Sequence, residues 1–276
     1  MKPRHMIAAF VVAASVASSA ALQDATRLRL SLVEGRKDVF TIKSEMKQTL
    51  DMAGMGQQEM TITSGMKMAV ETGKKGEDGK ASIEMAVSDF EMKLEGMPGA
   101  PDMPNPGNYV IKGKIDELGR ITDTKIEGAE ASMAQMMNAS SQQTPYFVVF
   151  PDKDVKVGDS WKIPIPKNDL AMTADSELTA KLLGEKTVKD VVVFEIQLMG
   201  DVLVDGDPSK ANPDVPFAMK TKGKVSMDGL YWVEKSSGRT IGYQTKMRSD
   251  MTMELTDMGM TISTKGSGTM TMDWVK

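Results

Sequence analysis

The chain has 276 residues, of which 41% are hydrophobic and 26% charged, a composition typical of a soluble globular protein. It has no cysteine, a single histidine (His5) and a net charge of −4. These counts exclude disulfides and argue against zinc sites, Ser-His-Asp triads and cysteine nucleophiles, which all need imidazole or thiol groups.

Residues 1–21 have the three-part layout of a secretory signal peptide. Lys2 and Arg4 precede an apolar stretch over residues 6–16, and small residues up to Ala21 follow it. The apolar stretch is shorter than the ~20 residues of a membrane-spanning helix, so we expect an exported protein, periplasmic or extracellular, without a membrane span. An uncleaved N-terminal anchor helix is the alternative. Without Lys2 and Arg4, 32 basic residues remain against 38 acidic ones, and we expect no nucleic-acid partner.

After residue 23, hydrophobic and polar residues alternate almost throughout, which is the pattern of half-buried β-strands. Glycine-containing turns separate the segments and predict consecutive antiparallel hairpins. Many segments exceed the usual ~5–6 residues of a strand, which favours twisted, curved sheets. We therefore predict an all-β protein with long antiparallel strands, resembling a half-barrel or an open barrel. The expected strands cover 27–34, 38–52, 60–71, 80–95, 109–116, 121–127, 160–165, 176–183, 190–204, 216–228, 230–235, 241–255 and 258–275.

Two features interrupt the alternation in the first half of the chain. The apolar positions of the segment 80–95 change parity at Ser88-Asp89, which predicts a β-bulge that bends the sheet. Residues 96–108 contain four prolines and three glycines, and this composition predicts an exposed loop.

One short helix is predicted over residues 130–138. Met133, Met136 and Met137 have helical spacing there and form an apolar stripe. Because so short a helix needs a surface to pack on, it is either a connector that covers one end of the sheet or a lid over a cavity.

The stretch Pro151–Trp161 reads Pro-Asp-Lys-Asp-Val-Lys-Val-Gly-Asp-Ser-Trp and differs from the methionine-rich strands around it. Pro151 ends the preceding segment, Gly158 and Asp159 favour a turn, and Trp161 supplies an apolar anchor. The stretch resembles the junction in a family of uncharacterised exported bacterial β-rich proteins, which are similar in layout to periplasmic lipoprotein carriers. The resemblance implies a curved antiparallel half-barrel with short helices on its concave side, and it assigns no activity.

A weak internal sequence similarity suggests that the chain consists of two halves. A Gly-Arg turn between two strands occurs at Gly119-Arg120 and again at Gly238-Arg239. We therefore expect an N-terminal β half over 22–150, which includes the short helix, and a C-terminal β half over 151–276, related by duplication.

The 26 methionines are the main oddity of the composition. Burial explains why many lie on the apolar face of a predicted strand, but leucine or valine would have higher β-propensity there. Methionine is either an adaptable core filler, the lining of a surface for varied apolar ligands, or a soft ligand for Cu(I), with oxidant protection as a variant of the last. The methionines assigned to apolar faces are Met46, Met52, Met60, Met66, Met68, Met85, Met92, Met219, Met227, Met247, Met251, Met253, Met258, Met260, Met270 and Met272.

The leading interpretation is a non-enzymatic exported β protein that binds a lipid, another apolar ligand or a protein partner on a methionine-lined concave face. It needs no cofactor, no metal and no catalytic residue. The alternatives are a Cu(I)-binding or oxidant-protective protein and a purely structural scaffold. The candidate ligand-binding residues are Met66, Met68, Met133, Met136, Met137, Met251, Met253, Met270 and Met272.

Overall fold

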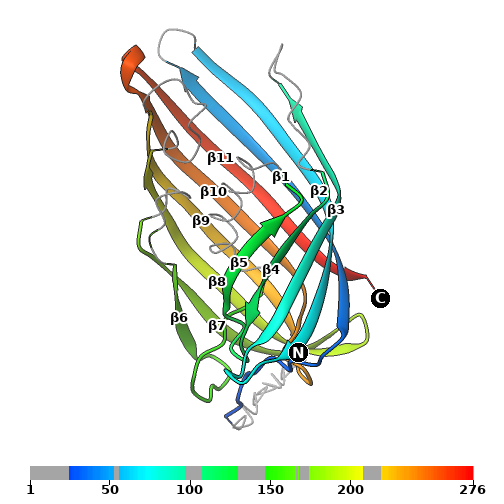
Figure 1. Cartoon of the computed structure of the whole chain (residues 1–276). Helices are drawn as coiled ribbons and strands as arrows, with labels where there is room; N and C mark the ends of the chain where they lie inside the picture. Colours follow the sequence, from blue (N-terminus) through cyan, green and yellow to red (C-terminus); the bar gives the residue numbers. More distant parts are fainter. Residues whose placement is uncertain are drawn as a thin grey trace, which may run out of the picture.

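The computed structural model describes residues 25–52, 56–96, 107–129, 147–165, 167, 174–207 and 219–275. These residues form one antiparallel sheet of eleven strands in the spatial order β5-β4-β3-β2-β1-β11-β10-β9-β8-β7-β6 (Figure 1). The strands are β1 Arg36–Met52, β2 Gly56–Lys75, β3 Ala81–Glu95, β4 Tyr109–Ile115, β5 Ile121–Glu127, β6 Ser160–Ile165, β7 Ser176–Val188, β8 Val191–Gly206, β9 Met219–Glu234, β10 Thr240–Leu255 and β11 Met260–Val275.

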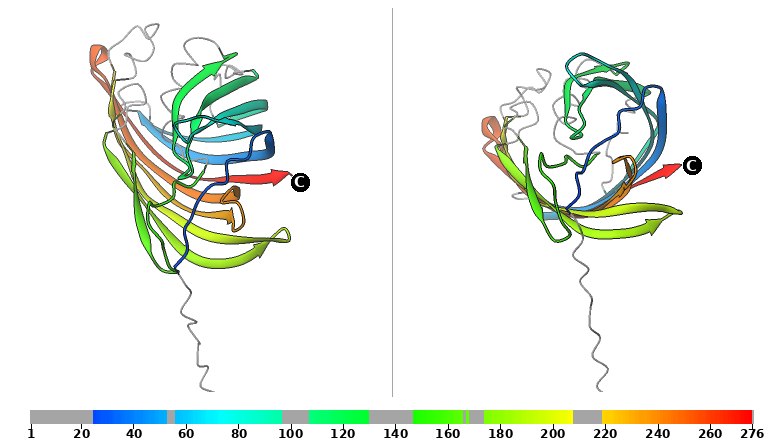
Figure 2. Two further views of the ribbon diagram at one scale, coloured as in Figure 1. Left: turned by 60° about the horizontal axis from the view of Figure 1, so that its bottom comes forward. Right: turned by 90° about the horizontal axis from the view of Figure 1, so that it is seen from below.

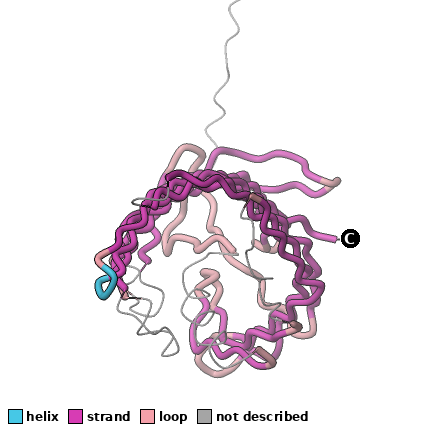
Figure 3. The backbone as a smooth tube through the Cα atoms, turned by 90° about the horizontal axis from the view of Figure 1, so that it is seen from above, coloured by secondary structure: helices cyan, strands magenta, loops and turns pink. Residues whose placement is uncertain are grey.

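The sheet curls into an open barrel. Viewed along its length, the backbone traces an incomplete ring whose two edges are β5 and β6 (Figures 2 and 3). The predicted halves 22–150 and 151–276 contain β1–β5 and β6–β11, and the single sheet continues between them where β1 pairs with β11 from Val39↔Val275 to Met52↔Ile262. The predicted all-β fold with long antiparallel strands in a curved sheet is confirmed. Residues 130–138, where a helix is predicted, lie outside the described residues, as do residues 1–21 and most of the predicted loop.

The predicted bulge in β3 is confirmed. Pairing between β2 and β3 shifts between Gly65↔Glu91 and Lys67↔Ser88, and Asp89 adopts a φ of 52°. One extra residue in β3 restores the apolar side chains after it to the same face as those before it, because side chains alternate strictly along a strand.

The predicted strand at 27–34 is wrong. The segment is extended, but no strand among the described residues pairs with it continuously. Leu30 N donates to Glu117 O at 2.8 Å, and Ser31 N donates to Ser237 O at 2.7 Å. Leu28 is nevertheless buried. The alternation therefore reports burial on one side of a chain that crosses the end of the barrel, without a ladder beside it.

Two further predictions at strand ends need correction. The segments 216–228 and 230–235 are one strand, β9, because Gly229 stays extended, and a Cβ there would lie 2.4 Å from Thr245 Oγ1. Gly229 thus allows β9 and β10 to approach closely, and it does not mark a turn. Met258 lies in the short 3₁₀ turn Thr256–Met258 and is 51% exposed, so it belongs to no apolar strand face.

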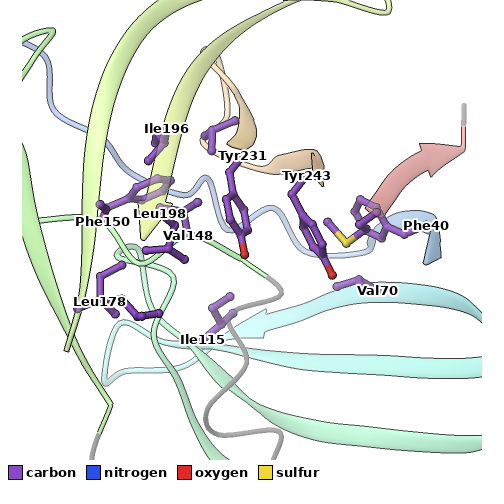
Figure 4. Packing of buried hydrophobic residues seen from close by; sticks show 14 of the residues in the cluster. Phe40, Val70, Ile115, Val148, Phe150, Leu178, Ile196, Leu198, Tyr231 and Tyr243 are labelled. Carbon is purple, nitrogen blue, oxygen red and sulfur yellow. The ribbon is translucent and has the colours of Figure 1, made fainter. Parts of the chain in front are cut away.

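The lower end of the barrel in Figure 1, called the closed end, contains a packed core. Side chains from β8, β9 and β10 meet Ile115 of β4 and Val70 of β2 across the interior, and Val148 and Phe150 fill the space between them (Figure 4). Trp161 of the junction stretch joins this core and donates from Nε1 to Val149 O at 2.8 Å. The buried members of the closed end include Leu28, Phe40, Met68, Met85, Ile115, Val148, Phe150, Trp161, Ile196, Leu198, Tyr231, Tyr243 and Met272.

Four charged side chains tie the strands together at the closed end. Arg239 donates to Asp38 and, at 2.9 Å, to Glu234, while its guanidinium lies 4.1 Å from the centre of the Trp274 ring. Arg36 Nε lies 3.3 Å from Asp38 Oδ2. Burial alone would raise the pKa of Glu234, but the hydrogen bond from Ser237 and the two arginine charges hold that pKa below its ordinary value.

Gly268 of β11 lies where the backbone of β1 comes close to the concave side of the sheet. A Cβ at Gly268 would lie 2.3 Å from Glu45 O and 2.9 Å from Met46 Cα. Curvature crowds positions that face the inside of a barrel, so only glycine fits at this point. Among the described residues, no helix is long and apolar enough to cross a membrane.

Candidate ligand-binding face

The two faces of the sheet differ in charge. Lys43 and Glu45 of β1, and Lys246 and Arg248 of β10, point to the convex face and are exposed. Above the closed end, the concave positions described for β1, β2 and β8–β11 carry no charged side chain. The convex face is therefore an ordinary solvated surface, and the concave face is the candidate for an apolar ligand.

Strand register brings methionines from distant parts of the chain into one row on the concave face. Met46 of β1 pairs with Ile62 of β2 and with Gly268 of β11. Gly268 pairs with Met247 of β10, which in turn pairs with Met227 of β9. Directly opposed Cβ atoms on neighbouring strands lie ~4.5–5.5 Å apart, so Met227 and Met247 are in contact range.

Further methionines surround this row and complete a surface that we call the methionine face. Met270 and Met66 lie on its closed-end side, and Met60, Met251 and Met253 on its open-end side, where β1 ends and β11 begins. All of these side chains are partly exposed. The methionine face consists of Met46, Met60, Met66, Met227, Met247, Met251, Met253 and Met270.

The predicted candidate residues fall into three groups. Met66, Met251, Met253 and Met270 belong to the methionine face. Met68 and Met272 are 1% and 0% exposed and pack in the closed-end core. Met133, Met136 and Met137 lie outside the described residues.

The alternation of the sequence predicts that Met46, Met60, Met227 and Met247 lie on apolar strand faces, but these four are not among the predicted candidate residues. The candidate residues on strands are pairs of methionines two residues apart on one strand. Proximity across strands depends on register, which a single strand's alternation does not specify.

The packing of the interior changes from one end to the other. At the closed end, a crevice beside Phe40 and Arg239 has a volume of about 40 Å³, enough for a few waters but too small for an acyl chain. Among the described strands, extensive contacts occur only between hydrogen-bonded neighbours, so no strand lies across the methionine face. A ring of eleven strands is also wider than the eight-stranded barrels that side chains alone can fill.

Metal-binding groups of the usual kind are not clustered in the described part of the chain, which has no group of three or more His, Asp or Glu residues close enough to hold an ion. Thioethers are the remaining donors, and Met227 with Met247 is the pair that register brings closest on the methionine face.

No protein-family model matches the chain, and no curated protein sequence matches it. Among the solved structures that match, two align with most of this chain. One is lipovitellin, in a structure that concerns its lipid–protein interactions: 89% of this chain aligns with 26% of that chain, at 8% identity and a TM-score of 0.47. The other is a LolA superfamily protein from Nitrosomonas europaea, where 86% of this chain aligns with 84% of that chain, at 10% identity and a TM-score of 0.17. Both TM-scores are low, and neither likeness bears on what this chain binds.

Proposed function

We propose that this chain is a non-enzymatic binding protein that holds an apolar ligand, such as the acyl chain of a lipid, on its methionine face. The main observation behind the proposal is that the two ends of the barrel interior differ in the kind and burial of their side chains. Branched and aromatic side chains are buried at the closed end, whereas the methionines above them stay partly exposed on an uncharged concave surface.

The chemistry of methionine supports this function. Its unbranched, polarizable side chain adopts many conformations, so neighbouring methionines adapt to ligands of different shape. Covering them with an acyl chain stabilises the complex by ~0.8 kcal/mol for each CH₂ group removed from water. The convex face cannot substitute, because its charged side chains would lose hydration under an apolar ligand.

Export is part of the proposal. A lipid-binding protein that passes through water between membranes needs a shielded apolar surface and no membrane anchor, in agreement with the signal peptide predicted at residues 1–21. The intact mass of the protein from its host tests this point, and cleavage after Ala20 or Ala21 is the expected result.

Binding of diphenylhexatriene, whose fluorescence rises in apolar surroundings, tests the function. Met247→Glu places a charge on the methionine face and should weaken binding at least ~10-fold. Lys246→Glu introduces the same residue one position earlier, on the convex face, and should leave binding unchanged. Met247→Gln replaces the glutamate variant if that variant does not fold. Equal loss of binding in the concave and convex variants, or no binding by the wild type, would refute the proposal.

A further inference from the structure

Two polar side chains lie within the methionine face and lean toward each other over a glycine. Gln48 of β1 pairs with Gly266 of β11, which pairs with Ser249 of β10. A Cβ at Gly266 would lie 2.6 Å from Ser249 Oγ and 3.0 Å from Gln48 Cγ. Gly266 therefore leaves the room that both side chains use, and we call Gln48 and Ser249 the polar pair.

The described residues do not use the full hydrogen-bonding capacity of the polar pair. Ser249 is 7% exposed, and none of the residues that the structure describes forms a hydrogen bond with its hydroxyl. Gln48 Nε2 donates to Met46 Sδ at 3.0 Å, and a thioether is a weak acceptor. Leaving a buried hydroxyl without a partner costs free energy, which a ligand that supplies the partner would recover.

A second hydroxyl on the concave face is in the same state. Thr221 of β9 pairs with Met253 of β10 and is 4% exposed, and within the described part of the chain its Oγ1 has no hydrogen-bond partner. It lies four positions along β9 from Val225, the partner of Ser249, which corresponds to ~13 Å toward the open end. Two buried hydroxyls thus lie along the path that an extended ligand on the methionine face would follow.

Within the described strands, the same face has no group that could neutralise a charge. Among its described concave positions no lysine, arginine, aspartate or glutamate occurs. An ionised carboxylate or phosphate placed beside Ser249 would lose its hydration without gaining a counter-charge. The part of the ligand that enters the barrel must therefore be uncharged.

We propose that the ligand is an uncharged amphiphile, an acyl ester, whose ester carbonyl accepts a hydrogen bond from the Ser249 hydroxyl. The Gln48 amide is a second donor to the same carbonyl, and the acyl chain lies on the flanking methionines Met46, Met60, Met247 and Met251. This inference rests on the proposed function and specifies the ligand class.

Two matched probes test it: pyrenedecanoic acid, at a mildly alkaline pH where it is ionised, and its methyl ester. The wild type should bind the ester ~10-fold more tightly than the acid. Ser249→Ala should weaken ester binding by ~5–10-fold, while diphenylhexatriene, which has no acceptor, should bind as before. The melting temperature of this variant should not fall, because the mutation removes an unpartnered buried hydroxyl.

Ser249→Thr, which keeps the hydroxyl, should keep the ester affinity, and Ser267→Ala on the exposed convex face of β11 is the matched control. Gln48→Leu should also weaken ester binding, and it replaces the alanine variant if that variant does not fold. Equal affinities for acid and ester, or an unchanged ester affinity in Ser249→Ala, would overturn the ester assignment alone. Failure of the wild type to bind diphenylhexatriene would overturn the proposed function itself.

Discussion

At the scale of single residues, the Arg239 side chain connects β1, β9 and β11 at the closed end. It reaches Asp38 of β1 and Glu234 of β9, and it stacks on Trp274 of β11. Its side chain is 13% exposed, so water does not replace these partners easily. The cluster fixes the β9–β10 turn against the start of β1 at the end of the barrel that carries the core.

Replacing Arg239 with alanine leaves Asp38 and Glu234 with Arg36 as their nearby cation, and we expect the free energy of unfolding to fall by about 2–3 kcal/mol. The matched control is Arg120→Ala. Arg120 also pairs with an acid, Asp116, at 2.7 Å, but its side chain is 60% exposed, so its loss should cost less than ~1 kcal/mol. Urea unfolding measures both, and equal losses would contradict a structural role for the cluster.

The buried Tyr231 hydroxyl should make the free energy of unfolding depend on pH in the alkaline range. Burial raises the pKa of its hydroxyl to about 12, opposed by a hydrogen bond with Thr245. Between pH ~10 and ~12 the unfolded chain loses this proton while the folded chain keeps it, so stability is full below that window and falls through it. The loss should reach about 2–3 kcal/mol at the top of the window. Tyr231→Phe should flatten this part of the stability–pH profile, and parallel profiles for the two proteins would show that the pKa is not raised.

At the scale of a strand, the two faces of β10 should respond differently to the same substitution. Met251→Asp puts a charge on the partly buried concave face and should cost about 1–3 kcal/mol. Arg248→Asp changes an exposed convex position and should stay within ~0.5 kcal/mol of the wild type. Thermal melts of the two variants test the assignment of faces, which equal destabilisation would refute.

The curvature of β11 gives a second contrast between positions of one residue type. Gly268→Ala places a methyl group against the backbone of β1 and should destabilise the protein by about 1–3 kcal/mol. At Gly65 of β2 the nearest atom to a Cβ is Ile42 O at 4.0 Å, so Gly65→Ala should be neutral or slightly stabilising. Chemical unfolding that ranks the two variants in the opposite order would contradict the crowding of the concave side.

The sequence predicts those elements whose signal is local. β5 and β6 match the expected bounds 121–127 and 160–165, because alternation and flanking turns coincide there. The bulge at Asp89 was visible as a change of parity. The strand predicted at residues 27–34 is wrong because alternation indicates burial on one side of the chain, whether or not a neighbouring strand is present.

The candidate site was less predictable than the fold. Which residues face inward follows from alternation, but the proximity of Met227 and Met247 follows from register between β9 and β10. Whether a methionine is core or surface depends on what fills the interior at its level: Met272 is 0% exposed under the closed-end core, whereas Met270, two residues earlier, is partly exposed. Neither property can be read from one strand.

At the scale of the whole molecule, an open barrel of eleven strands needs something to fill its interior. Side chains of the sheet, together with Val148 and Phe150, do so at the closed end. The uncharged methionine face lies above the closed end, toward the open end of the barrel. Its partly exposed thioethers are the surface on which the proposed ligand binds. In this proposal, the closed end stabilises the fold and the methionine face binds the ligand.

Native mass spectrometry of the protein purified from its host without detergent tests this central claim most directly. We predict that the wild type carries a non-covalent apolar molecule that is released on unfolding and identified as a lipid, and that Met247→Glu carries none. A wild type that carries copper instead, or a methionine-face variant that retains the same lipid, would contradict the account.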